Sequence, residues 1–184
     1  MKFQAHPYYV GLLSAAALHG ASHQQPQEFQ IVTDVRLRAA SAGRVRLHFF
    51  LKKRLLDTPT TEIKTATGTL RVSTPEATAF DLVRYAAGAG QLSNVATVLA
   101  ELAPTLNARK MVRAASAGVE MSVVQRTGYL LEQGGAGQTV EPLARWLLPQ
   151  KPSVTALRPD KSSKGCPRDE RWMVIVNEQV EDDL

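Results

Sequence analysis

The sequence predicts an α/β fold: a mixed sheet of four or five strands, a leading helix, and a group of helices in the second half. Three observations support this prediction. Short β-rich runs occur between residues 28 and 72, an apolar helical period begins near Ser73, and an apolar run of strand type follows residue 170. With 184 residues, of which 44% are hydrophobic, the chain can bury one core, so we expect residues 1–184 to form a single domain.

The first apolar run extends from Tyr8 to Leu18. It predicts a buried helix from about Tyr9 to His19, closed by Gly20 in the left-handed conformation. The run is too short to cross a bilayer, and we expect no membrane partner. A cleaved signal peptide of a secreted binding protein is an alternative, although only Lys2 precedes the run.

Four β-rich runs then predict strands at residues 28–33, 44–51, 61–65 and 69–72. In the second run, Arg44, Arg46 and His48 alternate with Val45, Leu47 and Phe49. This alternation predicts one wet, basic face and one apolar face.

Positive charge is concentrated in this strand region. From Arg36 to Arg71 there are nine basic residues against two acidic ones, a net of +7, whereas the whole chain carries +5. Such a surface is suited to phosphates or to an acidic protein. The residues that we expect to bind nucleic acid or a partner are Arg44, Arg46, Lys52, Lys53 and Arg54.

The second half of the chain is predicted to be helical. The Ser73-Thr74-Pro75-Glu76 segment is typical of a helix start, with Ser73 as N-cap and Glu76 at the third helical position. Further helices are predicted at residues 92–102, 106–117, 119–133 and 141–148. Residues 149–168 are expected to form a long surface loop, and Trp172 to Val176 a strand that returns to the sheet.

The sequence contains no complete catalytic or metal-binding pattern that we recognise, so we expect no enzyme activity, no metal and no cofactor. The competing hypothesis is a metal-dependent nuclease, in which Asp34 and Glu62 would hold Mg²⁺ and Lys64 would assist the attacking water. Cys166 is the single cysteine, which excludes an intramolecular disulfide and is typical of a protein of the reducing cytoplasm.

Several segments in this order resemble the AbiEi family, the antitoxins of bacterial type IV toxin-antitoxin systems. They are the run from Tyr8 to Ala21, the basic strands, the segment from Arg71 to Val83 (RVSTPEATAFDLV) and the closing Trp172 strand. The resemblance implies a C-terminal antitoxin domain of α/β type, without catalytic residues, that acts in phage defence by abortive infection.

The same resemblance implies a partner and a second role. AbiEi proteins counter a toxin of nucleotidyltransferase type, and a stable complex is not required. They also act as transcriptional regulators of their own operon through an N-terminal winged helix-turn-helix. Here the matching segment starts almost at Met1. DNA binding would therefore depend on the basic strand face, or on an N-terminal domain that this sequence does not contain.

Overall fold

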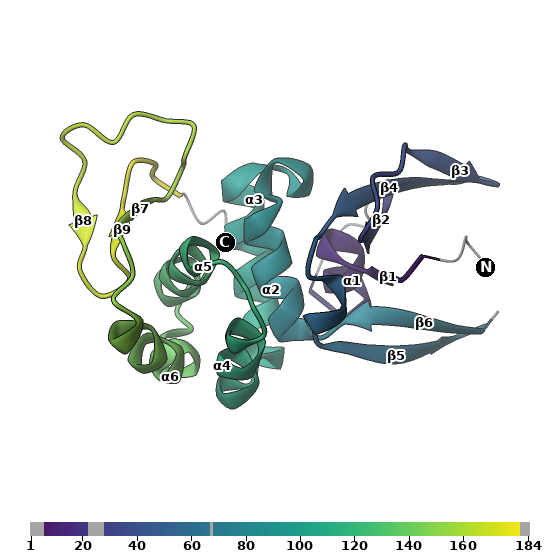
Figure 1. Cartoon of the computed structure of the whole chain (residues 1–184), viewed down its shortest axis with the longest axis horizontal. Coiled ribbons are helices and arrows are strands. Elements are labelled where there is room, and N and C mark those ends of the chain that lie inside the picture. The colour runs from purple at the N-terminus through teal and green to yellow at the C-terminus, as the bar shows by residue number, and fades with distance from the viewer. Residues whose placement is uncertain (1–5, 22–27, 67, 181–184) are drawn as a thin grey trace.

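The computed structural model describes residues 6–21, 28–66 and 68–180, and it confirms a mixed α/β fold. The first half holds six strands and one helix: β1 (Tyr8–Val10), α1 (Leu12–Leu18), β2 (Glu28–Thr33), β3 (Ala40–Ala42), β4 (Val45–Leu51), β5 (Thr60–Thr65) and β6 (Gly68–Ser73). The second half holds five α-helices and a small sheet: α2 (Pro75–Arg84), α3 (Gln91–Leu102), α4 (Ala108–Ser116), α5 (Met121–Gln133), α6 (Gly137–Leu147), β7 (Thr155–Ala156), β8 (Arg168–Asp169) and β9 (Val174–Ile175). Figure 1 shows the helices α2 to α6 between the two sheets.

The larger sheet has the strand order β3-β4-β2-β1-β6-β5. Strands β2 and β4 run parallel, as do β1 and β6, whereas the other neighbouring pairs are antiparallel. The sheet is therefore mixed, as predicted, but it contains six strands where the sequence suggested four or five. The additional strands β1 and β3 have three residues each, which is too short for an alternating pattern to be recognised.

The predicted helix at Tyr9–His19 is wrong in its first turn. Tyr8–Val10 forms β1, which pairs with β2 on one side and β6 on the other, and the helix begins only at Leu12. Gly11 makes the change of direction possible, because a Cβ atom at this position would lie 2.7 Å from Val32 Cγ2 on β2. The first apolar run thus supplies a central strand as well as a helix.

The start of α2 lies where the sequence placed it, but the capping residue differs. Thr74 is the N-cap, and its hydroxyl accepts a hydrogen bond of 3.3 Å from Ala77 N. Ser73 instead ends β6 and lies in the core. Glu76 does not complete a capping box, because its carboxylate accepts a bond of 3.1 Å from Asn107 N before α4. The segment therefore joins α2 to both β6 and α4.

The predicted helices of the second half are confirmed as α3 to α6, and with α2 they enclose most of the core. Within the described ranges, every helix is too short or too polar to cross a membrane.

The prediction that Trp172 to Val176 returns to the main sheet is wrong. Its central residues form β9, which pairs with β7 and β8 in a separate three-stranded sheet. Trp172 is fully buried against α5, where a Cβ on Gly128 would lie 2.0 Å from the indole ring. A continuous apolar run indicates burial, but it does not specify which sheet provides the neighbouring strands.

Candidate functional site

Lys52, the third of the five predicted binding residues, is not on the surface. It follows β4 and points toward α2, where its Nζ lies 2.7 Å from Asp81 Oδ1 and donates to the Tyr9 hydroxyl at 3.0 Å. The Tyr9 hydroxyl in turn donates to Asp81 Oδ2 at 2.7 Å. The side chains of Lys52 and Asp81 are only 6% and 1% exposed. The expected place of Lys52 in an exposed basic face is therefore corrected: it belongs to a buried ion pair.

This buried group connects three elements that are far apart in the sequence: β1, the end of β4 and α2. Burial lowers the pKa of Lys52, and the charge of Asp81 opposes that shift. Burial, together with the charge of Asp81, raises the pKa of Tyr9 well above its ordinary value. Since each polar atom has a partner within the group, the arrangement is suited to holding the sheet against the helical half.

The other four predicted residues are exposed, but they do not form one face. Arg44 lies in the turn before β4, and Arg46 on β4 lies 3.5 Å from Glu28. Lys53 and Arg54 come after the opposite end of β4, which is seven residues long. At about 3.3 Å per residue, the two pairs are about 20 Å apart. The predicted basic face is thus two separate regions.

A hollow next to the Arg54-Asp57 ion pair has two cations in its wall that the sequence analysis missed. The Arg54 guanidinium bonds to Asp57 Oδ2 at 2.8 Å and lies across Gly118, where an added Cβ would be 2.5 Å from Arg54 Cζ. Asp57 also lines a hollow of about 570 Å³ whose wall includes Lys110 and Arg113 of α4. We call Lys110 and Arg113 of this wall, together with Arg54, which adjoins the wall through Asp57, the basic hollow.

The basic hollow contains more positive than negative charge. Lys110 and Arg113 are exposed and three residues apart, so they share one side of α4, as residues at this spacing do. Of the two acidic residues in the lining, Asp57 is paired with Arg54, and Glu76 is buried with its carboxylate on Asn107 N. The hollow therefore offers cations to an anionic group that approaches from solvent. The i, i+3 spacing on α4 was the signal that could have revealed it.

The structure does not bring the nuclease residues together. Glu62 and Lys64 lie on the edge strand β5, whereas Asp34 follows β2, with β1 and β6 between the two strands. Three inter-strand spacings amount to about 14 Å, too far for two carboxylates to share one Mg²⁺. In the part of the chain that the structure describes, no three His, Cys, Asp or Glu residues are placed to hold a metal ion.

Comparisons with known proteins agree with this fold. The solved structure titled "Crystal structure of RV2827C protein from Mycobacterium tuberculosis" matches with a TM-score of 0.61 and 19% sequence identity. The match covers 91% of this chain and 61% of the other, so this chain spans about three fifths of the length of that relative. At this identity the match shows a shared fold alone. No curated protein matches the chain.

A family model supplies the assignment that the fold alone does not. The model of the AbiEi antitoxin C-terminal domain matches residues 9–133, which run from β1 to the end of α5. The matched residues include the buried Lys52-Asp81 pair and all three cations of the basic hollow. The chain belongs to the family of AbiEi antitoxin C-terminal domains.

Proposed function

We propose that this domain is the antitoxin part of a type IV toxin-antitoxin system that acts in phage defence in the bacterial cytoplasm. In this proposal its functional partner is a toxin of nucleotidyltransferase type, and no stable complex between them is required. The observation that carries the proposal is the match of the AbiEi antitoxin C-terminal domain to residues 9–133.

The proposed mechanism is non-catalytic. The buried titratable side chains of Lys52, Asp81 and Tyr9 bond to one another and are shielded from solvent. A substrate would have to displace those bonds to reach the lysine, at the full cost of uncovering a buried ion pair. This closure favours a structural role for the group and supports an antitoxin that works by binding.

The proposed contact surface is cationic. Arg54, Lys110 and Arg113 of the basic hollow would meet the phosphates of a nucleic acid or an acidic protein surface, and Lys53 would add charge beside them. Arg44 and Arg46 would contribute from the far end of β4. In a regulator of its own operon, the same cations would add phosphate contacts next to a DNA-reading domain, without reading sequence themselves.

Growth rescue tests the proposal. The chain is co-expressed with the nucleotidyltransferase-type toxin encoded beside it, and growth is compared with that of cells that hold the toxin and an empty vector. We expect the chain to restore growth. A folded chain that leaves an active toxin fully inhibitory would contradict the proposed function.

A further inference from the structure

The wall of the basic hollow combines positive charge with an exposed aliphatic side chain. Leu56, in the short 3-10 helix η1 (Leu55–Asp57), lines the hollow and is 71% exposed, more than any other large hydrophobic residue that the structure describes. A single exposed leucine is ordinary on a protein surface. Pro59 and Ala117, however, line the same hollow and are only half-buried, so Leu56 belongs to a small apolar area in the same wall as the cations.

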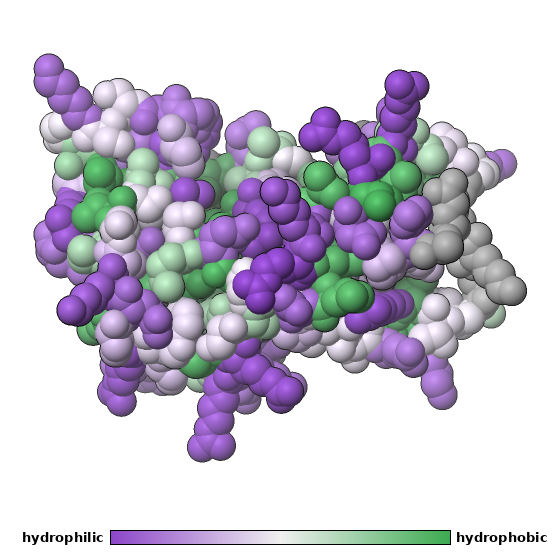
Figure 2. All heavy atoms as spheres, viewed as in Figure 1, coloured by the Kyte–Doolittle hydropathy of each residue, from purple (hydrophilic) through white to green (hydrophobic). Residues whose placement is uncertain are grey.

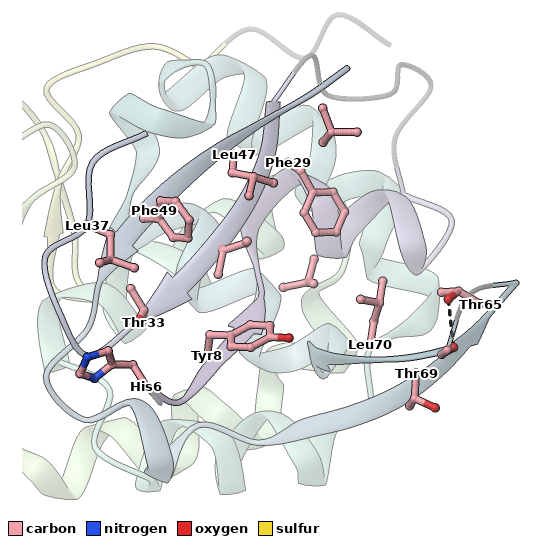
Figure 3. Close-up of a pocket in the computed structure, with 14 residues that line it drawn as sticks. His6, Tyr8, Phe29, Thr33, Leu37, Leu47, Phe49, Thr65, Thr69 and Leu70 are labelled. Atoms are coloured by element: carbon pink, nitrogen blue, oxygen red, sulfur yellow. Dashed lines mark hydrogen bonds between the residues drawn. The ribbon is translucent and has the colours of Figure 1, made fainter. Parts of the chain in front are cut away.

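A groove on the main sheet does not show this combination. Figure 3 shows side chains from several strands projecting into it, among them Tyr8, Phe29, Leu47 and Leu70, and its volume is about 330 Å³. No Lys, Arg, Asp or Glu occurs among its described lining residues. The sheet groove therefore offers no charge by which a particular partner could be selected, whereas the basic hollow offers both charge and apolar contact.

The two cations on α4 are available to a partner. Lys110 and Arg113 are exposed, and their side chains make no hydrogen bond or ion pair with any residue in the described ranges. In Figure 2, long hydrophilic side chains project from the lower edge of the molecule, along which Figure 1 shows α4 and α6. Residues three apart on a helix have Cβ atoms about 5–6 Å from each other, so one carboxylate can bond to both cations.

The same wall is poorly suited to the backbone of a nucleic acid. Asp57 and Glu76 also line it, so only two cations are unpaired there, which is enough for one or two carboxylates but not for a row of phosphates. None of its described residues is aromatic, and bases would find no side chain to stack on. A phosphate placed against Leu56 would lose its hydration to an apolar surface. These features favour a protein over a nucleic acid.

Hydroxyl groups of the wall can bind the backbone of a protein segment. Thr60 accepts a hydrogen bond of 2.9 Å from Arg71 Nε, and Thr74 accepts one of 3.3 Å from Ala77 N. Since both hydroxyls act as acceptors in these bonds, their O–H groups remain available as donors. Peptide carbonyl oxygens are acceptors, so a segment that lies in the hollow can satisfy part of its backbone there.

We propose that the basic hollow binds an acidic segment of a partner protein, whose carboxylates meet Lys110 and Arg113 and whose aliphatic side chain packs on Leu56. The hollow, of about 570 Å³, is comparable in size with pockets that enclose whole small ligands, so it has room for several side chains. Such a partner matches the hollow in charge and in apolar surface. The inference rests on the proposed function, because it selects protein over nucleic acid as the partner of the same surface.

The test is an NMR titration of the isotopically labelled whole chain with synthetic peptides. The first peptide carries two glutamates beside a leucine, and two matched peptides replace either the glutamates by glutamines or the leucine by serine. The glutamate peptide should shift the amide signals of Leu56, Lys110 and Arg113. Affinity should be lower by about fivefold for the glutamine peptide, which loses exposed ion pairs, and by about tenfold for the serine peptide, which loses apolar contact.

Two variants place the binding on the hollow. Leu56→Ser removes the exposed apolar side chain, and Lys110→Ala/Arg113→Ala removes the two cations. Both change exposed residues only, so the fold should be preserved. Each should weaken binding of the glutamate peptide by about fivefold or more. Leu148→Ser is the matched control and should bind like the wild type, because Leu148 is 56% exposed in another short 3-10 helix (Leu148–Gln150) that does not line the hollow.

Several outcomes would overturn the inference. They are no binding of the glutamate peptide, equal binding of the serine peptide, or binding that Leu56→Ser leaves unchanged. Tighter binding of a single-stranded oligonucleotide at the same amide signals would assign the hollow to nucleic acid. Loss of self-association or of binding to phosphatidylglycerol vesicles in Leu56→Ser would assign it to a second copy or to a membrane surface. Since none of these measurements involves the toxin, a chain that restores growth but does not bind the peptide would keep the proposed function and lose this inference.

Discussion

Lys52 and Asp81 form an ion pair at 2.7 Å in which both side chains are almost completely buried, and the pair joins the end of β4 to α2. The Tyr9 hydroxyl completes the group with one bond to each partner. The two halves of the fold therefore meet at a polar contact within an apolar core.

Removal of one partner should be strongly destabilising. Lys52→Ala leaves the Asp81 carboxylate buried without its cation, and it should lower the free energy of unfolding by about 3–5 kcal/mol. Urea denaturation measures the loss. The double variant Lys52→Met/Asp81→Leu should lose less than the sum of the two single variants, because a buried pair replaced by apolar groups leaves no charge unpaired.

The neighbouring residue supplies the control for this prediction. Lys53 is exposed, so Lys53→Ala should change the free energy of unfolding by less than about 0.5 kcal/mol. Equal losses for Lys52→Ala and Lys53→Ala would show that the buried pair does not stabilise the domain.

The stability of the domain should depend on pH in the alkaline range through Tyr85. Burial, followed by the charge of Asp81, raises the pKa of Tyr85 from 10.0 to about 12. The folded protein holds this proton more tightly than the unfolded chain. The stabilising contribution is therefore complete below pH 10 and is lost as the pH rises to 12.

Tyr85→Phe isolates this contribution. The variant should lose stability less steeply between pH 10 and pH 12 than the wild type, as measured by urea denaturation at each pH. Tyr9, with its raised pKa, acts in the same direction, and Lys52, with its lowered pKa, acts in the opposite one. Tyr9 and Lys52 are present in both the wild type and the variant, so their contributions cancel when the two pH profiles of stability are compared. Parallel plots of the free energy of unfolding against pH for the variant and the wild type would contradict the assignment of this pH dependence to Tyr85.

The contact between Trp172 and Gly128 should be intolerant of added volume. Gly128→Ala would place a methyl group 2.0 Å from the indole, so Trp172 must move, at a cost of about 1–3 kcal/mol. A shift in tryptophan emission should accompany this loss in the free energy of unfolding. Gly137→Ala is the matched control, since the nearest atom to its added Cβ is 3.8 Å away. If the two variants have the same stability, the small sheet does not depend on this contact.

The sequence predicted the helices and strands of the fold better than it predicted which elements pack against them. The alternation in β4 correctly separated Arg46 and His48 from Leu47 and Phe49. It could not show that helices cover the side of Phe50 and leave the apolar side as a groove, because that depends on residues distant in sequence. The same limit applies to Lys52, whose partners Tyr9 and Asp81 are 43 and 29 positions away.

The candidate site was found only in part for a similar reason. Arg54 was identified because it ends the densest basic run, Lys52-Lys53-Arg54. The hollow beside it, with Lys110 and Arg113 in its wall, results from the packing of α4 beside the segment that follows β4, which local sequence does not encode.

The central claim, that this antitoxin domain acts through the basic hollow, is tested most directly by growth rescue with matched variants. The triple variant Arg54→Ala/Lys110→Ala/Arg113→Ala removes the three cations of the hollow. The control Arg145→Ala/Lys151→Ala/Lys161→Ala removes three exposed cations elsewhere. Circular dichroism and urea denaturation establish that both are folded. We predict that the wild type and the control restore growth in the presence of the toxin and that the hollow variant does not. Full rescue by the folded hollow variant would contradict the account.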